Sequence, residues 1–307
     1  MGKTVLVVGA MAAALLLASM AALLTAKPGG GKPRTVTLVG AGDIAGCNNT
    51  RGRIKFKADR KTARLVGKIP GTVFTLGDNA YPKGTREQFR NCYDPTWGKY
   101  KKRTRPSVGL HEYHTPGAKP YFDYFRGRAG ERRGGYYSYD RGSWHIVVLN
   151  SICEEIGGCG RSSPQGRWLR TDLAQNPTKC TLAYFHDPLY ASGRGEDIPQ
   201  VRPFWDKLYD QHADVILSGN AHRYERFARI TPSGERSSAR GIRQFIVGTG
   251  GTARGTIKGP DEPRMQAKKV GAPGVLKLKL GSGFYKWKFV PVEGRKNYTD
   301  SGRARCH

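Results

Sequence analysis

The chain has 307 residues, of which 38% are hydrophobic and 10% are aromatic. A chain of this length and composition can bury a substantial core, which excludes disorder throughout. Its 52 lysines and arginines against 24 aspartates and glutamates give a formal net charge of +28. This charge attracts phosphate-rich polymers, anionic envelope glycans and acidic membrane surfaces, although scattered basic residues also serve as ordinary solvated faces. No zinc-finger, recognition-helix or aromatic-interleaved pattern occurs, so the sequence predicts no dedicated nucleic-acid-binding motif.

The N-terminal segment has the pattern of an export signal. One lysine precedes an apolar run from Val5 to about Ala26, after which the sequence turns abruptly polar. We therefore expect residues 1–26 to be a signal peptide and the protein to be secreted. The run of roughly twenty residues can also span a bilayer, so an uncleaved N-terminal anchor is the alternative. Residues 27–34 are rich in glycine and proline and predict a flexible linker, followed by one domain over residues 35–307.

The cysteines form an even set, which in an exported chain favours up to three disulfides over thiol chemistry or zinc binding. They are Cys47, Cys92, Cys153, Cys159, Cys180 and Cys306. Cys153 and Cys159 are close enough to join across a short Gly-rich loop, so we predict that pair. The other pairings stay open.

In chain order, β-branched runs alternate with helical stretches, which predicts an α/β protein with sheets covered by helices. The expected strands are Thr35–Val39, Thr72–Leu76, His145–Asn150, Thr181–Phe185, Val215–Leu217 and Gln244–Val247. The expected helices are Ala58–Lys68, Pro164–Ala174 and Arg202–His212. Near the end, apolar residues alternate with lysines in Val275–Leu280 and Phe284–Val290 on either side of Gly281-Ser282-Gly283, which predicts a β-hairpin.

Polar side chains come just past the C-terminal ends of several predicted strands, where binding sites of α/β sheets lie. They are Asp43, Asp78, His186 and the pair Asn220 and His222. Singly, such an aspartate is often a turn or helix cap, and such a histidine is often structural. Together with a nearby phenol, they are costly to desolvate without a cation between them, and mixed oxygen and nitrogen ligands suit iron, zinc or manganese.

Five sequence blocks then occur in a fixed order. They are GDIAG at 42–46, GDNAYPKG at 77–84, GLHEYHTPGA at 109–118, FHDPLYASG at 185–193 and SGNAHRYERF at 218–227. In these blocks the chain resembles the calcineurin-like metallophosphoesterase superfamily, and within it the purple acid phosphatase-like branch and its secreted bacterial members. The resemblance implies a two-sheet sandwich flanked by helices in four layers, with a metal site at the C-terminal ends of the strands.

The resemblance also implies roles for individual residues. Asp43 and His222 look like ligands of the first metal, and Tyr81 looks like its phenolate ligand, which favours ferric iron. Asp78 resembles the carboxylate that bridges both metals, and His186 a ligand of the second. The implied cofactors are therefore iron together with zinc, manganese or a second iron.

The implied activity is the hydrolysis of a phosphoester by an exported enzyme, through attack of a metal-bound hydroxide on phosphorus. His111, with Glu112 beside it, resembles the histidine that contacts the phosphate and protonates the leaving group, so both are candidate catalytic residues. The expected partner is a phosphorylated small molecule or an anionic polymer as substrate. Electrostatic association with an anionic cell surface is also expected.

Two departures from the family pattern affect the second metal. Leu110 stands where the family has the asparagine of Gly-Asn-His-Glu, and it offers no oxygen. Asn220 stands where the family usually has the first histidine of Gly-His-x-His, and its amide oxygen is a harder, neutral ligand. The alternative function is therefore a catalytically weakened binding protein for anionic polymers on the same fold.

Other enzyme classes fit less well. Gly40 to Ala45 matches a dinucleotide fingerprint, but the following residues do not continue as the required helix. The Gly-rich segment from Gly248 lacks the Gly-Lys-Ser/Thr ending of a phosphate-binding loop. A serine hydrolase is disfavoured because no Gly-x-Ser-x-Gly occurs.

Overall fold

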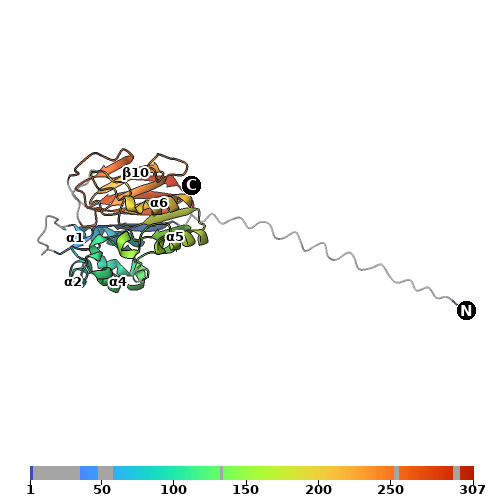
Figure 1. The fold of residues 1–307 in the computed structure, drawn as a ribbon, viewed down its shortest axis with the longest axis horizontal. Coiled ribbons are helices and arrows are strands. Elements are labelled where there is room, and N and C mark those ends of the chain that lie inside the picture. Colours follow the sequence, from blue (N-terminus) through green and yellow to red (C-terminus); the bar gives the residue numbers. More distant parts are fainter. Residues whose placement is uncertain (3–34, 48–57, 132–133, 252–255, 293–297) are drawn as a thin grey trace. The chain divides into compact units, whose positions relative to one another are not determined.

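The computed structural model describes residues 1–2, 35–47, 58–131, 134–251, 256–292 and 298–307. The predicted signal peptide and linker fall almost wholly outside these residues. Residues Arg34–His307 form one compact unit, drawn as a ribbon in Figure 1. Over the described ranges, no helix combines the length and hydrophobicity needed to cross a bilayer.

Strands and helices alternate through most of this unit. The strands are β1 Val36–Ala41, β2 Ala45–Gly46, β3 Thr72–Leu76, β4 Ala80–Tyr81, β5 Thr104–Ser107, β6 Tyr137–Arg141, β7 Trp144–Val148, β8 Cys180–Tyr184, β9 Val215–Ser218, β10 Tyr224–Ile230, β11 Ile242–Val247, β12 Met265–Lys269, β13 Gly274–Gly281, β14 Phe284–Pro291 and β15 Ser301–Arg305. The α-helices are α1 Asp59–Lys68, α2 Arg86–Gln88, α3 Leu110–Tyr113, α4 Lys119–Phe125, α5 Pro164–Gln175 and α6 Arg202–Asp210. Short helical turns of other types are η1 Phe89–Tyr93, η2 Trp97–Arg103, η3 Pro116–Ala118, η4 Arg126–Ala129, η5 Cys153–Ile156 and η6 Pro199–Val201.

The strands build two large sheets. The first has six strands in the order β15-β14-β13-β1-β3-β5, and the second has seven in the order β12-β10-β11-β9-β8-β7-β6. In the first sheet β1, β3 and β5 are parallel, and in the second β7, β8, β9 and β11 are parallel. Strands β3, β7, β8 and β9 are buried along their whole length, as expected for parallel strands covered on both faces.

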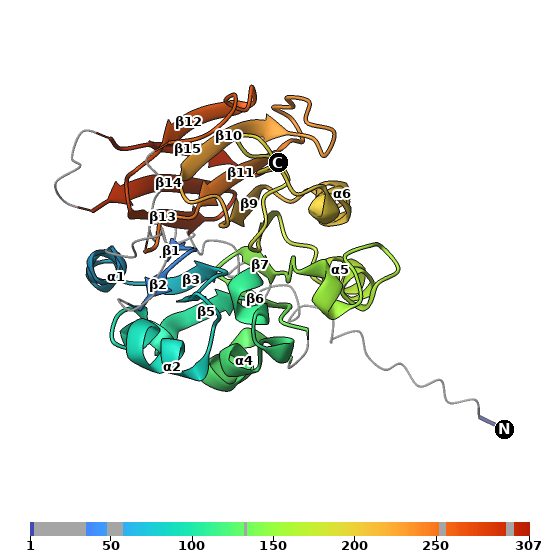
Figure 2. The same cartoon turned by 60° about the vertical axis from the view of Figure 1, so that its left-hand side comes forward.

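The two sheets form a sandwich between helices. One core cluster joins residues of both sheets, among them Leu38 and Val73 of the first and Leu182 of the second. A separate cluster lies where Leu169 of α5 and Phe204 of α6 pack on the alternate residues of the second sheet. Figure 2 shows α5 and α6 on one side of the molecule, away from α1 and α2. The predicted fold class, an α/β sandwich of two sheets flanked by helices, is confirmed.

The predicted elements all exist, with ends that shift by a few residues. The hairpin β13-β14 pairs Leu280 with Tyr285 and Gly281 with Phe284, as the alternation indicated. Strand β10 was not predicted, because charged residues interrupt its apolar pattern. Its Glu225 is fully buried and accepts a 2.7 Å hydrogen bond from the guanidinium of Arg223. That local pairing makes a buried charge tolerable, and hydrophobic periodicity does not reveal it.

All six cysteines form disulfides. Cys153 joins Cys159, as predicted, while Cys47 joins Cys92 and Cys180 joins Cys306. The carboxylate of Asp214 lies near the last pair. Bonded sulfurs are not thiolate ligands, so this group of residues does not hold a metal ion.

The surroundings of one buried histidine predict that the stability of the fold depends on pH. The ring of His145 lies between two carboxylates, 2.9 Å from Asp140 Oδ1 and 2.8 Å from Asp172 Oδ2. Burial acts to lower the pKa of His145, but the hydrogen bonds to Asp172 and Asp140 outweigh it and raise the pKa. A raised pKa means that this stabilisation is complete below about pH 6.5 and is lost as the pH rises through the folded-state value.

We therefore expect His145→Gln to lower the melting temperature more at pH 5.5 than at pH 9. Thermal unfolding of both proteins across this range measures the difference. His212→Gln, at an exposed position, is the control and should show no such trend. Equal losses at both pH values would contradict the proposed role of the imidazolium.

Candidate metal centre

Two aspartates lie in tight turns just past the ends of adjacent parallel strands. Asp43 follows β1 and Asp78 follows β3, with φ angles of 59° and 50°. Left-handed backbone is uncommon outside glycine, and aspartate is among the residues that tolerate it. The backbone N–H of Asp43 donates to Gly77 at 3.2 Å and that of Ile44 donates to Asp78 at 2.9 Å. The two turns are thereby fixed side by side, which holds both carboxylates in one place.

The phenol of Tyr81 lies between these carboxylates. Its oxygen is 2.8 Å from Asp43 Oδ1, 2.7 Å from Asp78 Oδ2 and 3.3 Å from His222 Nε2. Burial, followed by the charges of Asp43 and Asp78, raises the pKa of Tyr81 well above its usual value. A hydroxyl has one proton, so it can donate to only one of the two carboxylates. The other carboxylate contact is unfavourable unless a cation lies between the oxygens.

His186 presents a free ring nitrogen to the same cluster. Its Nδ1 donates to the carbonyl of Leu76 at 2.7 Å, which leaves Nε2 3.4 Å from Asp78 Oδ2. This Nε2 is buried and has no hydrogen-bond partner among the described residues. In the absence of a metal ion, burial lowers the pKa of His186 but Asp78 outweighs it and raises the pKa. Either a proton or a metal ion is therefore needed between this imidazole and the carboxylate.

His222 completes the opposite side of the cluster. Its Nε2 is 3.1 Å from Asp43 Oδ1, and the side chain is almost fully buried. The second oxygen of Asp43 is buried without a hydrogen-bond partner in the part of the chain that the structure describes. Ligand atoms of Asp43, Asp78 and His186 all lie within 4.8 Å of one another. The structure thus brings together the five strongest predicted ligands.

Glycines allow the backbone to approach these ligands closely. A Cβ atom on Gly109 would lie 2.4 Å from Asp78 Oδ1, and one on Gly219 would lie 3.0 Å from Asp43 Oδ2. The distance at Gly109 is too short for a real Cβ atom, so no other residue fits there without displacing Asp78, and the distance at Gly219 leaves almost no room. Gly109 and Gly219 belong to the blocks at 109–118 and 218–227.

His111 lies at the edge of the cluster with one ring nitrogen available. Its backbone N–H donates to Asp78 Oδ1 at 2.9 Å, and its Nδ1 lies 2.6 Å from the carbonyl oxygen of Pro82. Because a carbonyl only accepts, Nδ1 carries a proton. Nε2 lies 3.7 Å from Asp78 Oδ2 on a partly exposed side chain. The structure therefore places His111 where a substrate beside the cluster can reach it.

The catalytic role expected for Glu112 does not agree with its position. The side chain is fully buried, and its Oε1 accepts hydrogen bonds from the backbone of Asn79 at 2.8 Å and Ala80 at 3.1 Å. Its Oε2 accepts from the backbone of Gly109 at 2.9 Å. Burial and the neighbouring Asp78 raise the pKa of Glu112 to about 8. Glu112 thus braces the loop that carries Asp78, and we correct its role to a positioning residue.

Asn220 lies beside a carboxylate that sequence reasoning missed. Its Nδ2 donates to Asp187 Oδ1 at 3.0 Å, and its φ angle is 61°. Asp187 is 8% exposed and directly follows the predicted ligand His186. Its position next to His186 was the one sign in the sequence that Asp187 lies near the cluster. Leu110, by contrast, is 48% exposed and is, with Met1, one of two large hydrophobic side chains exposed in the described ranges.

The donor set fits a transition-metal centre. It combines carboxylate oxygens, a phenol and imidazole nitrogens, which suit iron, zinc and manganese. The unpaired atoms Asp43 Oδ2 and His186 Nε2 are buried within it, and bound cations would satisfy them. Asp43, Asp78, Tyr81 and His222 contact one another on one side of the cluster, and His186 lies beside Asp78 on the other side.

Among proteins of known sequence, the chain is similar to purple acid phosphatases of plants. No protein-family model matches the chain. Purple acid phosphatase 15 of Arabidopsis thaliana is 23% identical over 269 residues, which cover 75% of this chain and 49% of that protein. Purple acid phosphatase 22 of the same plant is 31% identical over 143 residues, covering 42% and 30%. The chain thus spans about half the length, or less, of these curated relatives.

Two solved structures share the fold. A purple acid phosphatase, PPD1, from yellow lupin (Lupinus luteus) gives a TM-score of 0.70 at 16% identity, covering 89% of this chain and 54% of that one. GAP50 of Plasmodium, described as the anchor in the inner membrane complex, gives 0.65 at 14% identity, covering 87% and 88%. At these identities the likeness establishes the fold.

Proposed function

We propose that the chain, a purple acid phosphatase-like member of the calcineurin-like metallophosphoesterases by its sequence relatives and its fold, is a metal-dependent phosphoester hydrolase. One observation carries this proposal. The Tyr81 oxygen lies within 2.8 Å of carboxylates from both Asp43 and Asp78, with two histidine rings against the same atoms. Such a cluster is costly to bury unless it binds a cation.

Asp43, Tyr81 and His222 would hold the first metal ion, Asp78 would be shared, and His186 with the amide of Asn220 would hold the second. Bound there, the cations would activate a water molecule and stabilise negative charge at phosphorus. A phenol among the ligands supports iron at the first position, paired with zinc, manganese or iron. His111 holds a proton on Nδ1 against the carbonyl of Pro82. With a second proton on Nε2, the imidazolium would donate that proton to the leaving oxygen of a substrate beside the cluster.

Elemental analysis of protein purified without added metal tests this proposal, together with a visible spectrum and turnover of p-nitrophenyl phosphate on the same sample. We expect two metal ions per chain, turnover, and a phenolate-to-iron absorption band that disappears in Tyr81→Phe. A protein that contains no metal and gives no turnover would overturn the proposal. Metal without the absorption band would overturn only the assignment to iron.

We further propose that the protein works outside the cell. Three disulfides support an oxidising compartment, because they persist in secreted proteins and are rare in the cytosol. The predicted signal peptide of residues 1–26, or its use as an anchor, lies outside the described residues. N-terminal sequencing of the mature protein distinguishes cleavage from anchoring.

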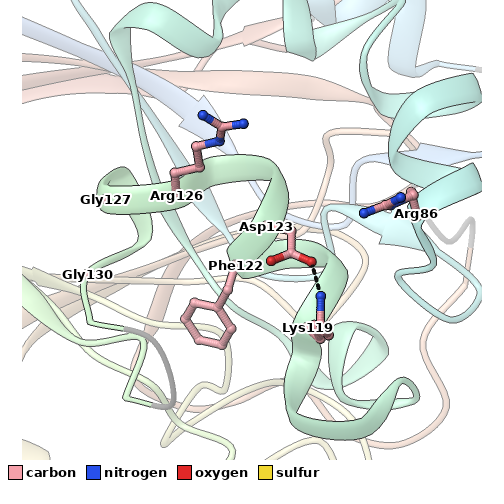
Figure 3. A pocket seen from close by; sticks show the side chains of 7 residues that line it. All are labelled: Arg86, Lys119, Phe122, Asp123, Arg126, Gly127 and Gly130. Atoms are coloured by element: carbon pink, nitrogen blue, oxygen red, sulfur yellow. Dashed lines mark hydrogen bonds and ion pairs between the residues drawn. The ribbon is translucent and has the colours of Figure 1, made fainter.

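A basic cavity supports an anionic partner. It has a volume of about 680 Å³ and lies on α2, α4 and η4. Arg86, Lys119 and Arg126 line it, and Asp123 is the one acid among its described lining residues (Figure 3). Lys119 Nζ already pairs with Asp123 Oδ2 at 2.5 Å. The two arginines therefore give this cavity an excess of positive charge, which suits phosphorylated small molecules, anionic polymers or an anionic cell surface.

We expect the double change Arg86→Ser and Arg126→Ser to weaken the binding of polyphosphate by about five- to thirtyfold at low salt, since each exposed contact contributes up to ~1 kcal/mol. Titration at several salt concentrations measures this effect. The matched control changes Arg60 and Arg64, which are exposed on α1, to serine. Equal losses in both double variants would show that only the net charge matters.

Leu110 favours a second candidate function, a binding protein for anionic polymers with a weakened second metal position. GAP50, which shares the fold, is described as an anchor. The change Leu110→Asn distinguishes the two functions, because it restores an amide oxygen at the position where the family has one. In a working enzyme we expect second-metal affinity and turnover to rise by at least about tenfold. Leu110→Ala, which supplies no ligand, should change neither, and a pure binding protein should respond to neither variant.

A further inference from the structure

The second metal position lacks the asparagine and the histidine that the family pattern supplies. Asn220 follows Gly219, which packs on His186, and its amide offers an oxygen on this segment. An amide has two different ends, and only its oxygen can bind a metal ion. Its value as a ligand therefore depends on which end faces the cluster. No such question arises for a carboxylate, whose two oxygens are equivalent.

Asp187 fixes the direction of this amide. A carboxylate can only accept hydrogen bonds, and Asp187 Oδ1 lies 3.0 Å from the Nδ2 of Asn220. The amide nitrogen is thereby held at Asp187, and the amide oxygen is directed away from it. If the amide were reversed, its oxygen would face Asp187 Oδ1, and two hydrogen-bond acceptors would lie against each other.

The backbone around this pair is held firmly against the cluster. Asp187 donates its backbone N–H to Ser151 Oγ at 3.0 Å, and Gly219 donates its N–H to the carbonyl of His186 at 2.9 Å. A Cβ on Gly219 would lie 3.3 Å from His186 Nδ1. The segment that carries Asn220 is therefore packed directly on the predicted ligand His186.

We infer that Asp187 is a positioning residue that turns the carbonyl oxygen of Asn220 toward the second metal ion, so that a carboxylate-oriented amide replaces the missing histidine. The inference rests on the proposed metal centre. It explains why a buried carboxylate follows His186, although the family roles assign it none. Groups that hydrogen-bond a metal ligand typically change metal affinity by 10- to 100-fold.

Titration of metal-free protein with Mn²⁺ by calorimetry tests the inference without reference to turnover. We expect Asp187→Asn to weaken the second binding event by about 10- to 100-fold and to leave the first event unchanged. The same change made in an Asn220→Ala background should have no further effect. The exchange of both residues, Asp187→Asn with Asn220→Asp, should restore binding, because the new amide donates to the new carboxylate and leaves it one oxygen for the metal.

Three results would overturn the inference. If Asp187→Asn lowers the melting temperature but not the metal affinity, the hydrogen bond only stabilises the left-handed turn at Asn220. If it weakens binding equally in the Asn220→Ala background, Asp187 binds the metal directly. If the wild-type protein binds no Mn²⁺, the metal centre itself fails, and that outcome is distinct because it appears before any variant is compared.

Discussion

Asp78→Asn is expected to abolish turnover and to weaken metal binding by more than about a hundredfold. Asp78 lies between several members of the cluster. Its oxygens contact the phenol of Tyr81, the ring nitrogens of His186 and His111, and the backbone N–H of His111. Changes to groups that merely support a ligand cost 10- to 100-fold in affinity, so the loss of a shared anionic ligand should exceed that range.

Calorimetric titration and p-nitrophenyl phosphate turnover on the same preparations measure this effect. Asp261→Asn is the matched control, because Asp261 is exposed and pairs with Lys268 away from the cluster. Asparagine has the shape of aspartate, so the fold should persist. Burial disfavours the charge on Asp78, but His186 and His111 outweigh it and hold its pKa below the usual range. A variant that keeps both metal ions and full turnover would show that the cluster is not the active site.

The sequence predicted which residues come together in this candidate site, because most of them follow the ends of strands. Asp43 and Asp78 come directly after two buried runs that pair in parallel, so they had to meet at one edge of the sheet. His186 follows a strand of the other sheet. The packing of one sheet against the other brings the aspartates and His186 together. Periodicity along a single strand does not show this packing.

The errors concern side chains whose role depends on neighbours distant in sequence. Glu112 is next to His111 in the chain, yet its carboxylate is directed to the backbone of Asn79 and Ala80, so proximity in sequence was misleading. Asp187 was missed because its partner, Asn220, is 33 residues away. A hydrogen bond of this kind depends on the three-dimensional arrangement of two loops, and no local pattern encodes it.

The strands also differ in how well the sequence predicts them. The buried strand β3, TVFTL, is rich in β-branched and apolar residues and was predicted with its observed ends. The edge strand β15, with the sequence SGRAR, has almost no apolar content and gave no signal. It pairs with β14 by backbone hydrogen bonds and is followed at once by Cys306, so a covalent link helps to hold it in the sheet.

Removing that link, by changing Cys180 and Cys306 to serine, is expected to cost about 5 kcal/mol of the free energy of unfolding at 25 °C. The two cysteines are 126 residues apart, and the stabilisation of an ideal cross-link grows with the logarithm of the loop that it closes. Cys180 begins β8 in the second sheet, while Cys306 follows β15 in the first, so the bond joins the two sheets. The loss is a large share of the ~5–15 kcal/mol that stabilises a typical domain.

The matched control is the pair Cys153 and Cys159, which are 6 residues apart and whose removal should cost only about 2 kcal/mol in the same treatment. Urea unfolding under non-reducing conditions measures both values. Neither pair contacts the metal cluster, so metal binding by the folded protein should survive each change. Equal losses in the two variants would show that local contacts around the sulfurs, and not the length of the closed loop, set the stabilisation. A larger loss of unfolding free energy at Cys180 and Cys306, together with unchanged metal binding, would have a clear meaning. The two sheets would depend on the disulfide for stability but not for the geometry of the candidate site.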